Sequence, residues 1–141
     1  MQETLGRLVA ILHRRNTAYL NQVLKPYQIT SAEVGILRTL YRKEDRTQEE
    51  LASLLSIDKA AIARAVRTLE KKEYLLRISD PVDRRCNRLF LTERAKTLQA
   101  EIEPAIDAWN QHAREELGAE AYELLCTTLY SLLTTDSKEP S

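Results

Sequence analysis

The sequence predicts a mainly α fold that contains a single β-hairpin, and two observations support this. The chain has only 3 Gly and 4 Pro among its 141 residues, too few for the many turns of an all-β protein. Apolar residues recur every three or four positions along most of the chain, as in amphipathic helices, and change to a period of two between residues 75 and 91. A chain of this length fits one domain with helical extensions.

The first two helices are predicted by apolar stripes and by start and stop signals. Leu5 begins a stripe that runs to Leu24, and Pro26 ends this helix because its ring removes a backbone donor. Thr30 and Glu33 form a capping box, in which a hydroxyl and a carboxylate accept hydrogen bonds from free backbone N–H groups. A second helix is therefore expected from residue 30.

Two further short helices are expected, joined by a tight turn. Thr47 and Glu50 repeat the capping box at the start of the third helix, and Asp58 caps a fourth helix over residues 59–72. At about 100° per residue, the fourth helix has an apolar side opposite a side of basic and small residues. The apolar side holds Ile62, Ala65, Val66 and Leu69, and the solvent side carries Lys59, Ala60, Ala61, Arg64, Arg67 and Lys71.

The segment over residues 75–91 is expected to be a β-hairpin. Apolar side chains alternate with polar ones on both sides of SDPVDRRC, where Asp80 and Pro81 favour a turn.

Two long helices are expected after the hairpin. Thr92 caps a fifth helix that reaches Leu117 with a bend at Pro104, and Gly118 suits its end. A sixth helix is expected over residues 119–135, followed by a flexible tail at residues 136–141.

Two capped helices joined by a turn and followed by a hairpin are the pattern of a winged helix-turn-helix, expected over residues 30–95. The helices outside it, residues 1–29 and 96–135, have apolar faces that three helices and a hairpin leave uncovered. We therefore expect these N- and C-terminal helices to form a dimerisation lobe with a second copy of the chain. The alternative is a monomer in which they pack against one another.

Charge is unevenly distributed, although 21 basic and 21 acidic residues give no net charge. Residues 59–91 contain nine basic and four acidic residues, whereas residues 92–141 contain four basic and ten acidic ones. Because the basic segment can attract phosphate groups, we interpret the solvent side of the fourth helix as a DNA-binding surface. Its alanines permit close approach, and its arginines can reach base edges or phosphates. The alternative is an ordinary solvated helix face.

The sequence resembles the MarR family of bacterial transcriptional regulators. The resemblance rests on residues 47–95, which read TQEELASLLSIDKAAIARAVRTLEKKEYLLRISDPVDRRCNRLFLTERA, and on a wing signature in which DPVDRR precedes Leu89, Leu91 and Thr92. It implies a dimer formed by the terminal helices, with the fourth helix in the major groove. It also implies that Arg85 reaches the minor groove and that Asp83 orients the wing. The predicted DNA contacts are Lys59, Ala60, Ala61, Arg64, Arg67, Lys71, Arg84 and Arg85.

The resemblance further implies a small effector, often a phenolic anion, that binds between the dimer base and the DNA-binding lobe. Side chains with the aromatic or cationic character to line such a pocket are His13, Arg14, Arg15, Trp109 and His112. Each of them fits an interface or surface position equally well.

No enzyme activity, cofactor or metal site is predicted. The chain has 2 His and lacks an HExxH motif, a Gly-rich phosphate loop and a CxxC motif. Cys86 lies beside Arg84 and Arg85, whose charges favour a thiolate, so a redox role and an inert wing residue both stay open. Cys126 lies among leucines and is expected to be buried.

The sequence therefore predicts a dimeric, sequence-specific transcriptional regulator, in this interpretation a repressor that an effector releases from DNA. Its partner is a pseudo-palindromic operator in double-stranded DNA, and the alternative is a winged-helix module that binds a protein. The segment MQETLGRLVA lacks a signal-peptide pattern, and no apolar run reaches the ~20 residues of a membrane span. A cytoplasmic protein without a membrane partner is expected.

Overall fold

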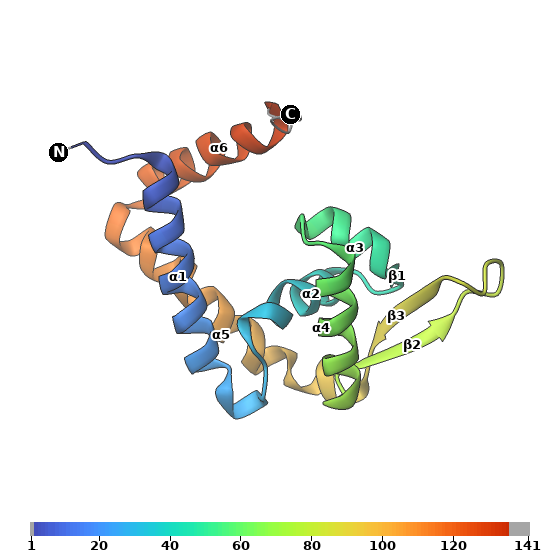
Figure 1. Cartoon of the computed structure of the whole chain (residues 1–141). Coiled ribbons are helices and arrows are strands. Elements are labelled where there is room, and N and C mark those ends of the chain that lie inside the picture. The colour runs from blue at the N-terminus through green and yellow to red at the C-terminus, as the bar shows by residue number, and fades with distance from the viewer. Residues whose placement is uncertain (1, 136–141) are drawn as a thin grey trace. The chain divides into compact units, whose positions relative to one another are not determined.

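The computed structural model describes residues 2–135, which form helices and one small sheet (Figure 1). The mainly α prediction and the hairpin are confirmed. The elements are α1 (Leu5–Val23), the 3-10 helix η1 (Lys25–Tyr27), α2 (Ser31–Arg42), β1 (Arg46–Thr47), α3 (Gln48–Leu55), α4 (Lys59–Lys71), β2 (Leu75–Ser79), β3 (Asn87–Leu91), α5 (Glu93–Leu117) and α6 (Ala119–Thr135).

The chain divides into two compact units, and the boundary between Ile106 and Asp107 lies inside α5. The first unit contains every element from α1 to β3 and the first half of α5. The second contains the end of α5 and α6, and α5 is helical on both sides of Pro104.

Local caps set the starts of the two helices of the helix-turn-helix, although only the Thr47 half of the capping box expected with Glu50 forms. The Thr47 hydroxyl accepts a hydrogen bond from the backbone N–H of Glu50 at 3.1 Å. The Asp58 carboxylate accepts one from the N–H of Ala61 at 2.8 Å. Such caps satisfy free N–H groups of the first helical turn, so residues close in sequence determine where α3 and α4 begin.

The hairpin is part of a three-stranded antiparallel sheet in the order β1-β3-β2. Strands β2 and β3 pair in a register that sets Leu75 opposite Leu91, and β1 pairs with β3 through Arg46 and Leu89. Strand β1 is not predicted from the sequence. A strand of two residues is too short to show an alternating pattern.

The core of the first unit buries the apolar sides of α2, α3 and α4 against the sheet and α5. Burying a Leu or Ile side chain contributes about 1.5–3 kcal/mol. This packing turns the apolar side of α4 inward, so its basic side faces solvent. The core includes Ile36, Leu37 and Leu40 of α2, Leu51 of α3, Ile62, Val66 and Leu69 of α4, Leu89 of β3 and Ile102 of α5.

A buried carboxylate joins the start of α2 to the end of α4. Glu33 is only 2% exposed, and its Oε1 accepts hydrogen bonds from the N–H and the hydroxyl of Thr30, both at 2.9 Å. The same oxygen receives the ammonium of Lys72 at 2.7 Å, whereas Oε2 has no hydrogen-bond partner. The ion pair therefore compensates a charge that is already incompletely solvated.

We expect Lys72→Met to lower the free energy of unfolding by about 1–3 kcal/mol, because it leaves the Glu33 carboxylate buried without its cation. Chemical denaturation measures this loss. Lys71→Met is the matched control, since Lys71 is exposed one position earlier on the chain, and it should change stability little. Equal stabilities for the two variants would contradict the assigned role of the pair.

Large apolar side chains stay exposed on both terminal segments. In the first unit these include Leu5, Leu8 and Leu12 of α1, and in the second Leu124 and Leu133 of α6. No residue of α6 is buried. The expectation that Cys126 is buried is wrong within this chain, since Cys126 is exposed on α6.

Within residues 2–135, no helix is both long enough and apolar enough to cross a membrane. The predicted flexible tail, residues 136–141, lies outside the described residues.

Candidate nucleic-acid interface

A tight turn positions α4 relative to α3. Ser56 adopts the left-handed conformation with φ of 53°, and the N–H of Ile57 donates to the carbonyl of Ala52 at 3.1 Å. Asp58 follows at once as the cap of α4. Three residues thus end one helix and start the next, which gives the helix-turn-helix that the sequence predicts.

The solvent side of α4 is basic and open. Lys59, Ala60, Arg64, Arg67 and Lys71 are exposed, and Ala61 is half-buried. Among the described residues 2–135, neither Arg64, Arg67 nor Lys71 forms an ion pair, whereas Lys59 pairs with Glu49 at 3.2 Å. Unpaired cations beside alanines are suited to a polyanion, because they lose no internal partner when they bind phosphate.

The turn between β2 and β3, which we call the wing turn (residues 80–86), is organised by its own carboxylates. The Asp80 carboxylate accepts hydrogen bonds from the N–H groups of Val82 at 2.8 Å and Asp83 at 3.4 Å. These bonds, that to Val82 above all, and the nearby Arg88 guanidinium lower the pKa of Asp80 below its usual value. The carboxylate is therefore held in its charged form, in which both of its oxygens can accept hydrogen bonds.

Asp83 contacts Arg85 within this wing turn. Its Oδ1 accepts from the backbone N–H of Arg85 at 3.1 Å and from the guanidinium Nε at 3.4 Å. The Arg85 side chain is otherwise 93% exposed. Arg84 is exposed as well. The wing thus presents two cations to solvent, one of which is oriented by a neighbouring carboxylate.

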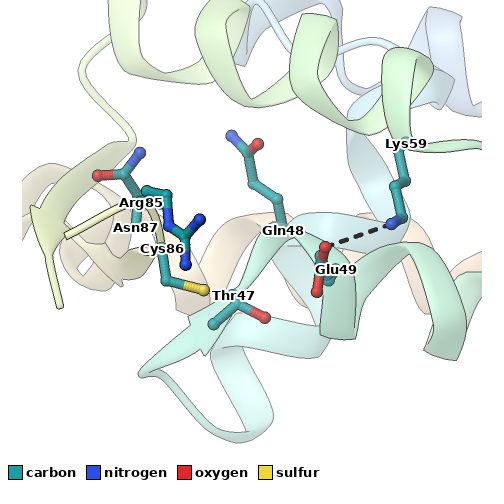
Figure 2. Close-up of a pocket in the computed structure, with 7 residues that line it drawn as sticks. All are labelled: Thr47, Gln48, Glu49, Lys59, Arg85, Cys86 and Asn87. Atoms are coloured by element: carbon teal, nitrogen blue, oxygen red, sulfur yellow. Dashed lines mark hydrogen bonds and ion pairs between the residues drawn. The ribbon is translucent and has the colours of Figure 1, made fainter. Parts of the chain in front are cut away.

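A cleft of about 230 Å³ lies where the wing, α3 and α4 meet (Figure 2). Arg85 of the wing turn and Lys59 of α4 both line this cleft. Both are predicted DNA contacts, Lys59 from its place on the solvent side of the helix and Arg85 from the wing signature. Gln48 and Asn87 also line the cleft. Neither was predicted as a site residue, because a single amide side chain forms no pattern in the sequence that would identify it. Cys86 lines the cleft too, with its thiol directed toward Thr47 in Figure 2.

A second cavity, of about 570 Å³, lies between α1 and α2. Of the residues expected to line an effector pocket, the structure places His13 in its wall, with Asn16 and Thr17. Ile57 of the helix-turn-helix lines it as well. Arg14 and Arg15 are exposed on α1.

Trp109 and His112 belong to the second unit, so their share in an effector pocket stays a prediction. His112 lies 4.0 Å from Glu116 on its own helix.

Comparison with known proteins identifies the fold. Residues 29–87 match the model of the MarR family, a segment that runs from the start of α2 through the wing turn. This segment is a MarR-family domain. Among solved structures the chain is similar over 94% of its length to a MarR transcriptional regulator from Methanosarcina mazei Go1, with 29% identity, a TM-score of 0.86 and 96% of that chain covered.

Two further relatives match across nearly the whole chain. A mutant MarR from E. coli, solved in complex with operator DNA, is 26% identical, with a TM-score of 0.82 and with 92% of this chain and 93% of that chain covered. The HTH-type transcriptional regulator BilQ from Clostridioides difficile (strain CD3) is 23% identical over 91% of this chain and 86% of the relative. The winged helix-turn-helix segment of this chain thus matches a family of transcriptional regulators, not of enzymes.

Proposed function

We propose that this chain is a dimeric, sequence-specific transcriptional repressor that binds a pseudo-palindromic DNA operator. The observation that carries the proposal is the exposed basic side of α4, where Arg64, Arg67 and Lys71 form no ion pair with the described residues, together with the exposed Arg85 of the wing. α4 would enter the major groove, where base edges are distinguishable, and Arg85 the minor groove, where width is read. The residues proposed to contact DNA are Lys59, Ala60, Ala61, Arg64, Arg67, Lys71, Arg84 and Arg85, with Asp83 orienting Arg85.

The dimer is supported by the exposed leucines of α1 and α6, which need a partner surface. A two-fold dimer would present two copies of α4 to DNA about one helical turn, ~34 Å, apart. The operator should therefore contain two inverted half-sites. We also propose that the protein acts in the cytoplasm.

The salt dependence of duplex binding tests DNA as the partner. Each phosphate neutralised lowers the logarithm of the affinity with a slope of about −0.9 per logarithm of salt concentration. We expect a steep slope that becomes shallower by about one for each phosphate contact removed, for example in Lys71→Ala. A flat response would contradict DNA binding and favour the alternative, a winged-helix module that binds a protein.

We also propose that a small phenolic anion occupies the cavity between α1 and α2 and weakens operator binding. Two observations support this. The cavity wall combines His13 with apolar residues, and it includes Ile57, which directly precedes the cap of the recognition helix α4. A ligand that favours one position of Ile57 would shift α4 between binding and non-binding arrangements.

Addition of hydroxybenzoates to the protein–operator complex is expected to release the DNA, and His13→Ala should raise the concentration required by about tenfold, equivalent to ~1.4 kcal/mol. Fluorescence anisotropy of the labelled operator measures this release. Replacing Arg14, Trp109 and His112 in turn with Ala shows whether these residues share the site. If His13→Ala responds like the wild type, the cavity does not hold the effector.

A further inference from the structure

We propose that Arg88 is a positioning residue for DNA binding, which holds the wing turn so that Arg85 is presented to the minor groove. This inference rests on the proposed function. Arg88 lies on β3, outside the residues that the sequence marks as DNA contacts, and its side chain is 31% exposed. It acts through two carboxylates that flank it.

The first carboxylate anchors Arg88 to the body of the first unit. The Nε of Arg88 donates to Oδ1 of Asp45, and its Nη2 donates to the backbone carbonyl of Asp45 at 2.9 Å. The N–H of Asp45 in turn donates to the carbonyl of Leu89 at 2.9 Å. Asp45 is therefore held from both sides, and its position just before β1 places it on the edge of the sheet.

The conformation of Asp45 fits this anchoring role. Its φ is 63°, in the left-handed region that Asp adopts more readily than most residues other than Gly. This backbone turn directs both the side-chain oxygen and the main-chain carbonyl to the same guanidinium. The hydrogen bond that Arg88 donates to the Asp45 carboxylate is also the main reason that the pKa of Arg88 is raised.

The second carboxylate connects Arg88 to the wing turn. The Nη1 of Arg88 lies 3.5 Å from Oδ2 of Asp80, whose other oxygen caps the N–H groups of Val82 and Asp83. The N–H of Asp80 donates to the carbonyl of Cys86 at 2.9 Å, which closes the turn. Because Asp83 then holds Arg85, one chain of contacts runs from Asp45 through Arg88 and Asp80 to the predicted minor-groove residue.

A guanidinium suits this position better than an ammonium, since its fork of donors reaches Asp45 twice and Asp80 once at fixed angles. Arg88→Lys keeps the charge but cannot reproduce this geometry. The pair of Arg77 and Glu70 provides a matched control. Arg77 is on the neighbouring strand β2, its side chain is 30% exposed, and its partner is on α4, so Arg77→Met breaks an ion pair without touching the wing turn.

A double-mutant cycle on a labelled duplex selected by the wild-type protein tests the role of Arg88. We expect Arg88→Met to weaken binding by about fivefold or more in the wild-type background and by less than about twofold in an Arg85→Ala background. Arg88→Lys should lie between wild type and Arg88→Met. Equal losses in both backgrounds would show that Arg88 acts independently of Arg85, and no loss at all would also overturn the proposal.

Backbone dynamics of the free protein provide a second measurement that does not depend on DNA binding. In Arg88→Met, NMR order parameters of Val82, Asp83 and Arg85 should fall from the level of ordered backbone toward less than about 0.6, while Arg77→Met leaves them unchanged. Unchanged order in Arg88→Met would overturn the proposal even if the wild-type protein bound no duplex. Failure of the wild type to bind DNA, with the expected loss of order present, would instead count against the proposed function alone.

Discussion

Deleting residues 119–141 is expected to abolish the dimer and to weaken operator binding by about 10²-fold or more, because two linked half-site contacts become one. The deletion removes α6, whose exposed leucines are proposed to form the interface with those of α1. Sedimentation velocity measures the assembly, and anisotropy of a labelled operator measures the affinity.

Deletion of residues 136–141 alone is the control for this experiment, since it leaves the whole of α6 in place. This shorter deletion should preserve both the dimer and the affinity. If the longer deletion gave a folded dimer with wild-type affinity, α6 would have no part in assembly, and the dimer would have to form elsewhere.

The second large effect is expected from the arginines of the DNA-binding surface. Arg64→Ala should cost roughly 1–3 kcal/mol on the operator and relax the preference at particular base pairs, because an arginine in the major groove reads base edges. Arg85→Ala should weaken binding to many sequences together, because an arginine in the minor groove responds mainly to groove width. Asp83→Ala should produce a smaller loss of the same kind, since it only orients Arg85.

Affinities for the operator and for a scrambled duplex, at two salt concentrations, separate these roles. Lys96→Ala is the control, because Lys96 is a half-exposed cation at the start of α5, 3.8 Å from Glu44 and outside the proposed surface. Losses no larger than that of Lys96→Ala for all three variants would mean that the basic side of α4 and the wing are only a solvated surface.

The parts of this fold that the sequence could predict are those determined by neighbours along the chain. Asp58 caps α4 by bonding to Ala61, three residues away, and the hairpin shows its period of two directly in the sequence. The basic side of α4 follows from helical geometry once the apolar residues are known. The structure therefore leaves each of Lys59, Arg64, Arg67 and Lys71 on the side where the sequence analysis expects it.

The features that the sequence could not predict join residues that are distant along the chain. Arg88 meets Asp45 across 43 positions, and nothing in the spacing of either residue indicates the pairing. The two residues of β1 become a strand only because β3 offers an unpaired edge. Cys126 belongs to a leucine-rich helix that is typical of a core, yet no residue of α6 is buried within the chain.

The cavity that contains His13 shows the same limit. It forms where α1 meets α2, so its wall includes Ser31, Val34 and Ile57, which no local pattern connects to His13. The imidazole of His13 could be singled out from the sequence, whereas no pattern there marks the polar Asn16 and Thr17 beside it. Side chains with generic character become a site only through the packing that gathers them.

Selection of bound fragments from a pool of random duplex DNA tests most directly the claim that this surface reads DNA as a dimer. The purified full chain should enrich fragments that share two inverted half-sites with centres about one helical turn, ~34 Å, apart. The same selection with Arg64→Ala should lose the preference at specific positions within each half-site. Recovery of no common sequence, or of a common sequence without a dyad, would contradict the account.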